Sequence, residues 1–123
     1  MVNYADIDTL SSVYLEDSFV LEILEPSGEP SFRGEFVLTE NHPRYSTPAS
    51  GEQYCYADGM LTFPNVTRVE WVRRSTRHFT DAAGEEDLGN IDYLDRVDDY
   101  WLIGGDWGEA RVFTEGAPRL VLA

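Results

Sequence analysis

The sequence predicts an all-β protein, a single-domain antiparallel sandwich or barrel of about nine short strands that covers residues 1–123. Many segments alternate apolar and polar residues with a period of two, and Gly, Pro, Asn and Asp separate these segments at short intervals. At 123 residues the chain is long enough for one core and too short for two. Its 42% of hydrophobic residues are enough to fill that core.

The first 25 residues predict a helical turn followed by a strand. Residues 1–12 mix polar and apolar positions, and we expect Asp6 or Asp8 to cap a short helical turn that contains Leu10. Residues 17–25 alternate with a period of two, which indicates a strand that is buried at its centre. One face of this strand carries Phe19, Leu21 and Ile23, and the other carries Ser18, Val20, Glu22 and Leu24.

Two hairpins are expected in the next segment. A turn at residues 26–29, with the sequence Pro-Ser-Gly-Glu, joins the first strand to a second alternating run at residues 32–39. Residues 40–52 contain two Pro and one Gly, so we expect a long loop there. The dipeptide Asp58-Gly59 separates two further apolar runs and suits a type I′ turn, in which both central positions need a positive φ. We therefore predict a hairpin centred on Asp58 and Gly59.

The second half of the chain predicts one long bent strand and several short ones. Residues 66–79 are rich in β-branched and aromatic side chains, and their length favours a bulge, with Val69 and Trp71 pointing inward. Residues 80–89 have the composition of a turn. The remaining strands are expected at residues 90–97, 100–103, 110–114 and 120–122.

Composition narrows the class of partner. The formal net charge is -14 at pH 7, the isoelectric point is near 4.2, and the chain contains no Lys. Such a charge repels nucleic acid and anionic membranes and favours basic proteins or cations, although it also serves simply to keep a small protein in solution. The chain begins without a basic and apolar leader, and no apolar run reaches the length of a membrane span. We therefore expect a cytoplasmic protein with no nucleic-acid or membrane partner.

The acids are most concentrated between residues 81 and 109, where ten acidic residues accompany a single basic residue, Arg96. The spacing lacks the alternate oxygen ligands and the closing Glu of a calcium loop, so no metal site is predicted, and solvated turns are the simpler alternative. Glycines flank Trp107, which we expect to be partly exposed beside these acids. The predicted partner-binding surface comprises Glu85, Glu86, Asp87, Asp92, Asp98, Asp99, Asp106 and Trp107.

A run of arginines between residues 68 and 77 precedes these acids and suggests an alternative function. Arginine binds carboxylates and other anions through its planar fork, so a small-ligand-binding β-barrel could use a pocket lined by Arg68, Trp71 and Arg73. A bulge would be needed to bring Arg68 to the same side as the other two. Cross-strand pairing of the arginines with the abundant acids is the simpler structural explanation.

The sequence shows no catalytic constellation. The chain has two histidines, His42 and His78, and it contains no nucleophile elbow, phosphate loop, H-E-x-x-H or paired-cysteine motif. The single cysteine, Cys55, excludes an internal disulfide, and between Tyr54 and Tyr56 it is expected to be a small core residue. We therefore predict no catalytic residue and no cofactor. With 23 acids in the chain, a carboxylate pair that acts as in a glycosidase stays an open alternative.

Three short motifs resemble those of small bacterial β-rich domains, some of which are akin to the immunity proteins of polymorphic toxin systems. The motifs are Leu15-Glu16-Asp17-Ser18-Phe19-Val20-Leu21 before a hairpin, Gly89-Asn90-Ile91-Asp92, and Gly105-Asp106-Trp107-Gly108. The resemblance covers about the first third of the chain and its acidic later segments, and it carries over no functional residue. It implies a cytoplasmic, non-enzymatic protein that neutralises a toxin by binding, and an acidic surface suits a basic toxin. The leading expectation is therefore an acidic binding protein, an immunity-type inhibitor of a basic protein partner.

Overall fold

The computed structural model describes residues 2–26, 29–75, 79–80, 84 and 86–123. Strands make up nearly all of its regular structure, which confirms the all-β prediction. The elements in chain order are β1 (Val2–Asn3), the 3-10 helix η1 (Tyr4–Asp6), β2 (Val13–Leu24), β3 (Ser31–Leu38), β4 (Cys55–Thr62), β5 (Arg68–Arg74), β6 (Phe79–Thr80), β7 (Glu86–Asp87), β8 (Gly89–Val97), β9 (Tyr100–Gly105), β10 (Gly108–Phe113) and β11 (Arg119–Leu122).

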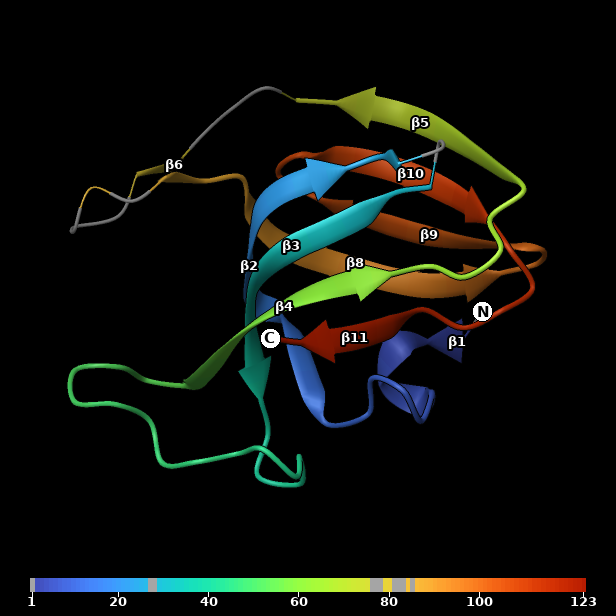
Figure 1. Ribbon diagram of the computed structural model, residues 1–123. Helices are drawn as coiled ribbons and strands as arrows, with labels where there is room; N and C mark the ends of the chain where they lie inside the picture. The colour runs from blue at the N-terminus through green and yellow to red at the C-terminus, as the bar shows by residue number, and fades with distance from the viewer. Residues whose placement is uncertain (1, 27–28, 76–78, 81–83, 85) are drawn as a thin grey trace.

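Nine of the strands form one antiparallel sheet in the order β11-β4-β3-β2-β8-β9-β10-β5, with β1 paired to β8, while β6 and β7 form a small sheet of their own. The pairs Phe19↔Asn90 and Val20↔Gly89 join β2 to β8. The sheet folds over at this junction, so that β3 and β4 lie in front of β8, β9 and β10 (Figure 1). Among the described residues, the terminal strands β5 and β11 do not pair with each other. The architecture is therefore an open sandwich.

The core lies between the two layers because alternate residues of each strand point inward. Phe32 and Phe36 of β3 are fully buried, and Phe32 packs against Trp107 with 4.9 Å between the ring centroids. Cys55 belongs to the same cluster, as the sequence predicted. The cluster also contains Tyr4, Leu10, Val13, Leu15, Val20, Leu38, Leu61, Phe63, Ile91, Leu94, Trp101, Ile103, Ala110 and Val112.

The first hairpin is confirmed, but its first strand is longer and less regular than predicted. Strand β2 begins at Val13, and its register against β3 shifts between Tyr14 and Phe19 and again between Val20 and Glu22. The alternation predicted that Phe19 and Ile23 lie on the same face of the strand, but the register shifts place them on opposite faces. Ile23 packs against the core, whereas Phe19 stacks on Tyr56 on the outer face of the sheet. Two of the four residues of the predicted turn, 27 and 28, lie outside the described residues.

The predicted hairpin at Asp58 and Gly59 is wrong. Both residues lie inside the continuous strand β4, opposite Glu35 and Gly34 of β3, and neither adopts the positive φ that a type I′ turn requires. Strand β4 is an interior strand with β11 on its other side, and a Cβ atom at Gly59 would lie 3.0 Å from the Val121 carbonyl oxygen. Glycine therefore serves a close approach between strands here and not a turn.

Two other predicted elements differ in detail. Helix η1 lies earlier than the predicted helical turn and does not contain Leu10, which lies in the turn that follows it. Asn3 caps η1 through a side chain that accepts a hydrogen bond from the backbone of Ala5, so neither Asp6 nor Asp8 is its cap. Strand β5 is shorter than the predicted strand, and it contains the expected irregularity, a register shift against β10 between Glu109 and Ala110. Residues 76–78 of the predicted strand lie outside the described residues.

Candidate functional site

The predicted partner-binding acids are spread over the molecule. Glu86 and Asp87 form β7, just before β8 begins, whereas Asp98 and Asp99 form the turn that follows β8. Strand β8 has nine residues and is therefore about 30 Å long. The two pairs of acids consequently lie at opposite ends of this strand and do not form one surface. Glu85 lies outside the described residues.

Asp92 and Asp106 interact with each other through space. Although Asp92 is exposed as a residue, burial of its carboxyl group raises its pKa, and the negative charge of Asp106 raises it further. The positive charge of Arg73 lowers the same pKa. Gly89 provides room for Asp106, because it has a φ of +101° and a Cβ atom there would lie 2.5 Å from Asp106 Oδ2. The structure thus brings these two predicted residues together beside an arginine.

Trp107 is not exposed, and the prediction that it lies on a partner-binding surface is wrong. Its side chain is 1% exposed, and its indole nitrogen donates a 3.1 Å hydrogen bond to the Asn90 carbonyl oxygen. Asp106 and Trp107 form the two-residue turn between β9 and β10, from which the indole folds back into the core against Phe32 and Trp71. The flanking glycines indicated a turn correctly, but they do not determine which way its side chains point.

The structure does not bring the predicted ligand-binding residues into one pocket. Arg68 borders a cleft of about 670 Å³ that is lined neither by Trp71 nor by Arg73. Trp71 packs edge to face against Trp107, and Arg73 donates a 3.2 Å hydrogen bond to the Gly105 carbonyl oxygen. The cleft beside Arg68 is lined by Asn65, Thr67, Arg68, Asp99, Phe113, Thr114, Glu115 and Gly116.

Three arginines of the neighbouring strands β5 and β10 form ion pairs with nearby glutamates. Arg68 Nη2 lies 3.1 Å from Glu70 Oε2, and Arg111 Nη1 of β10 lies 3.6 Å from Oε1 of the same carboxylate. Arg74 lies 3.2 Å from Glu25, which follows β2. These side chains are about half exposed, so each pair contributes only about 0.2–1 kcal/mol to the free energy of unfolding.

The outer face of β2, β3 and β4 carries a cluster of aromatic side chains that the sequence analysis did not single out. Phe19 and Tyr56 stack with 5.7 Å between their ring centroids and an interplanar angle of 24°. Tyr54 meets Tyr56 edge to face at 6.1 Å and Tyr14 at 6.3 Å. Val37 is 3% exposed but does not belong to the core cluster, since it lies on this outer face opposite Tyr14 and Tyr56. The four rings therefore form a continuous apolar surface that stays partly open to solvent.

Three carboxylates act on the same cluster. The Tyr54 hydroxyl donates a 2.7 Å hydrogen bond to Asp17 Oδ2, and this bond is the main reason why the pKa of Tyr54 is raised to about 12. Burial raises the pKa of Tyr56, and the negative charges of Asp17, Glu52 and Glu35 raise it further. The rings therefore lie in a field of negative charge. We call the set of Tyr14, Asp17, Phe19, Glu35, Glu52, Tyr54 and Tyr56 the aromatic-acidic face.

Local sequence explains part of this arrangement. Tyr54 and Tyr56 flank the buried Cys55, so strand alternation points both rings outward, and this pattern was available in the sequence. The ring of Phe19 reaches the same face because the pairing of β2 with β3 is irregular just before it. At this irregularity the Ser18 hydroxyl donates a hydrogen bond to the Tyr14 carbonyl oxygen at 2.7 Å and accepts one from the Val37 amide at 2.9 Å. No sequence pattern shows that β2 and β4 lie on either side of β3.

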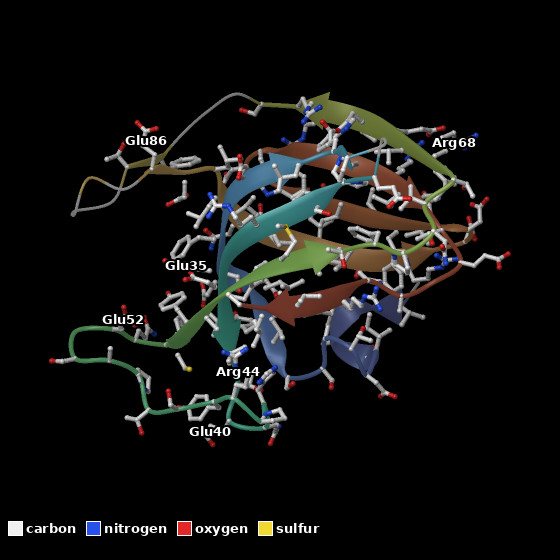
Figure 2. All side chains as sticks on the ribbon, viewed as in Figure 1. Glu35, Glu40, Arg44, Glu52, Arg68 and Glu86 are labelled. Atoms are coloured by element: carbon white, nitrogen blue, oxygen red, sulfur yellow. The ribbon has the colours of Figure 1, made fainter. Side chains whose placement is uncertain are left out.

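The aromatic-acidic face is separate from the layer that contains β5 and β10, which carries Arg68, Arg74 and Arg111. In Figure 2, Glu35 and Glu52 lie on one side of the molecule, together with Glu86, and Arg68 lies on the opposite side. A shallow groove of about 260 Å³ continues the face towards the long loop before β4, where Tyr45 and Pro48 border it together with Tyr14 and Tyr54. An extended segment of a partner could therefore contact both the rings and the loop.

Comparison with family models, with curated proteins and with solved structures found no significant match, so no relative supplies a function for the chain. Within the described part of the chain, no helix is long and apolar enough to cross a membrane. Among the same residues, no three His, Cys, Asp or Glu side chains converge as the ligands of a metal ion would.

Proposed function

We propose that the protein binds a basic protein partner through the aromatic-acidic face. The observation that supports this most is the gathering of four partly exposed aromatic rings and three carboxylates on one sheet face. Aromatic side chains provide large contact areas at little cost in conformational entropy and are enriched among the residues that contribute most to protein interfaces. Carboxylates beside them select partners of positive charge.

The overall charge supports the same proposal. A net charge of -14 attracts a basic partner over distances of about a Debye length and speeds its association, but it does not define where the partner binds. The aromatic-acidic face supplies that place, because only desolvated contact between complementary groups distinguishes one partner from another. In this proposal the protein acts by forming a stoichiometric complex, as an inhibitor of the immunity type would.

A matched pair of double variants tests the proposal. In the first, Asp17→Asn and Glu52→Gln remove two charges from the aromatic-acidic face. In the second, Asp98→Asn and Asp99→Asn remove two charges from the turn after β8, where Asp98 has a φ of 51° that Asn tolerates well. Both double variants have the same net charge, so they separate the position of the charges from their number.

The measurement is a pull-down from native lysate with the tagged wild-type protein and both double variants, at low and at high salt. We expect the wild type to recover one basic protein in equal amount and to lose it as salt rises. The Asp17/Glu52 variant should lose it at low salt as well, and the Asp98/Asp99 variant should retain it. Loss with the Asp98/Asp99 variant and retention with the Asp17/Glu52 variant would contradict the proposal and return attention to the turn after β8.

A further inference from the structure

We infer that the group bound on the aromatic-acidic face is an arginine side chain of the partner, placed flat on a ring with a carboxylate at its edge. This inference rests on the proposed function and narrows it to one kind of cationic group. Its support comes from the way in which the protein places its own arginines on the opposite layer.

Two arginines of β5 show the same unit of three groups. The guanidinium carbon of Arg74 lies 4.0 Å from the ring centre of Trp71, and Arg74 also forms an ion pair of 3.2 Å with Glu25. The guanidinium carbon of Arg68 lies 4.0 Å from the ring centre of Phe113, and its carboxylate partner is Glu70 at 3.1 Å. Each unit therefore consists of a guanidinium group, an aromatic ring beneath it and a carboxylate beside it.

Arg111 of β10 repeats this unit at a longer distance. Its guanidinium carbon lies 5.6 Å from the ring centre of Tyr100, and it shares the Glu70 carboxylate at 3.6 Å. Arginine suits such units because the guanidinium group is planar, is weakly hydrated and hydrogen-bonds carboxylates in its own plane while its face rests on a ring. Lysine carries a compact and strongly hydrated charge, so it gains less from stacking on a ring.

The aromatic-acidic face presents two of the three groups. The rings of Tyr14, Phe19, Tyr54 and Tyr56 are partly exposed, and the carboxylates of Asp17 and Glu52 lie close enough to raise the pKa of Tyr56. Among the residues that the structure describes, no arginine stacks on any of these four rings. A partner's arginine would complete the unit and would also offset the mutual repulsion of the carboxylates.

The test uses three synthetic peptides of equal length: hexa-arginine, hexa-lysine, and hexa-citrulline, whose side chain is nearly the shape of arginine but has no charge. Their dissociation constants are measured by isothermal titration calorimetry against the wild-type protein at low salt. A cation–ring contact at an exposed site corresponds to about a two- to fivefold gain in affinity. We therefore expect hexa-arginine to bind about two- to fivefold more tightly than hexa-lysine, and hexa-citrulline to show no binding.

Two ring-removing variants then locate the contact. Tyr56→Leu removes one of the four rings of the aromatic-acidic face and should reduce the preference for arginine over lysine, whereas Tyr100→Leu removes a ring of the opposite layer and should leave that preference unchanged. A second readout needs no variant: the side-chain protons of the bound arginine should shift upfield in the NMR spectrum, because they lie over an aromatic ring.

The outcomes separate this inference from the proposed function. Equal affinity for the arginine and lysine peptides, or a preference that Tyr56→Leu leaves unchanged, would overturn the arginine inference and leave binding of a basic protein standing. No binding of either basic peptide would count against both. Binding of hexa-citrulline as tight as that of hexa-arginine would also overturn the inference, because the charge would then contribute nothing.

Discussion

The hydroxyl of Tyr54 donates its hydrogen bond to Oδ2 of Asp17 across the outer face of the sheet, from the segment before β4 to the middle of β2. The two residues are 37 positions apart in sequence, so this bond exists only in the folded chain. It stabilises the protonated form of Tyr54 and holds the ring beside the Asp17 carboxylate.

This bond predicts a late titration of Tyr54. Its pKa in the folded protein is about 12, above its ordinary value of 10.0. The stability that it contributes is therefore complete below pH 10 and is lost as the pH rises from 10 through about 12. The difference between the ultraviolet titration curves of the wild type and Tyr54→Phe isolates this group. Asp17→Asn should move the midpoint of that difference back towards 10, and an unchanged midpoint would show that the bond does not hold the proton.

Asp92 predicts a stabilising substitution. Its pKa is raised by burial of its carboxyl group and by the charge of Asp106, so its contribution to stability is present at low pH and is lost as the pH rises through its folded pKa. Asp92→Asn should therefore raise the free energy of unfolding at neutral pH by a few tenths of a kcal/mol, a small effect because solvent screens this exposed position. Urea denaturation at neutral and at acidic pH measures it. The gain should vanish below the ordinary pKa of an aspartate, and a gain that persists there would contradict the electrostatic explanation.

Removing the Ser18 hydroxyl should lower the stability of the protein strongly, although it changes the side-chain volume only slightly. The hydroxyl is fully buried and satisfies both the Tyr14 carbonyl oxygen and the Val37 amide where the pairing of β2 and β3 is interrupted. Ser18→Ala leaves both backbone groups without this partner and should lower the free energy of unfolding by about 1–3 kcal/mol. Denaturant titration measures the loss. Ser11→Ala, at an exposed position, should change it by less than about 0.5 kcal/mol.

Removing the Trp107 side chain should destabilise the protein strongly, because it leaves a cavity in the core. The indole ring packs on Phe32 and Trp71 and is 1% exposed, so Trp107→Ala should lower the free energy of unfolding by about 3–5 kcal/mol. Val121 is 54% exposed, and Val121→Ala should have an effect within about 0.5 kcal/mol. Thermal unfolding followed by circular dichroism compares the two. A loss below about 1 kcal/mol for Trp107→Ala would show that the indole does not fill the core.

Local pattern was sufficient for most strands and insufficient for several turns. The alternation in residues 32–39 predicted β3 almost to its ends, and the composition of residues 40–52 predicted the long loop. Asp58-Gly59 misled because glycine serves two purposes: it adopts a positive φ in turns, and it lets neighbouring strands approach closely. The sequence alone does not show which of the two applies.

The candidate site was harder to predict than the fold. The acids of residues 86–106 form a group in the sequence, but β8 separates Glu86 and Asp87 at one of its ends from Asp98 and Asp99 at the other. Tyr14 and Phe19 of β2 are far from Tyr56 of β4 in the chain, and they meet it because β2 and β4 pair with opposite edges of β3. Their common face depends on the register of these strands, which includes two irregularities in β2.

The sequence by itself determined the all-β class, most of the strands and the negative charge, because these depend on the alternation, composition and count of neighbouring residues. The tertiary structure decided that Trp107 is buried, that β4 is continuous, and that aromatic rings and carboxylates share one face. A shift of one residue in strand pairing moves every side chain of that strand to the other face. The content of each face is therefore a property of the assembled sheet, whose long-range pairing no local pattern specifies.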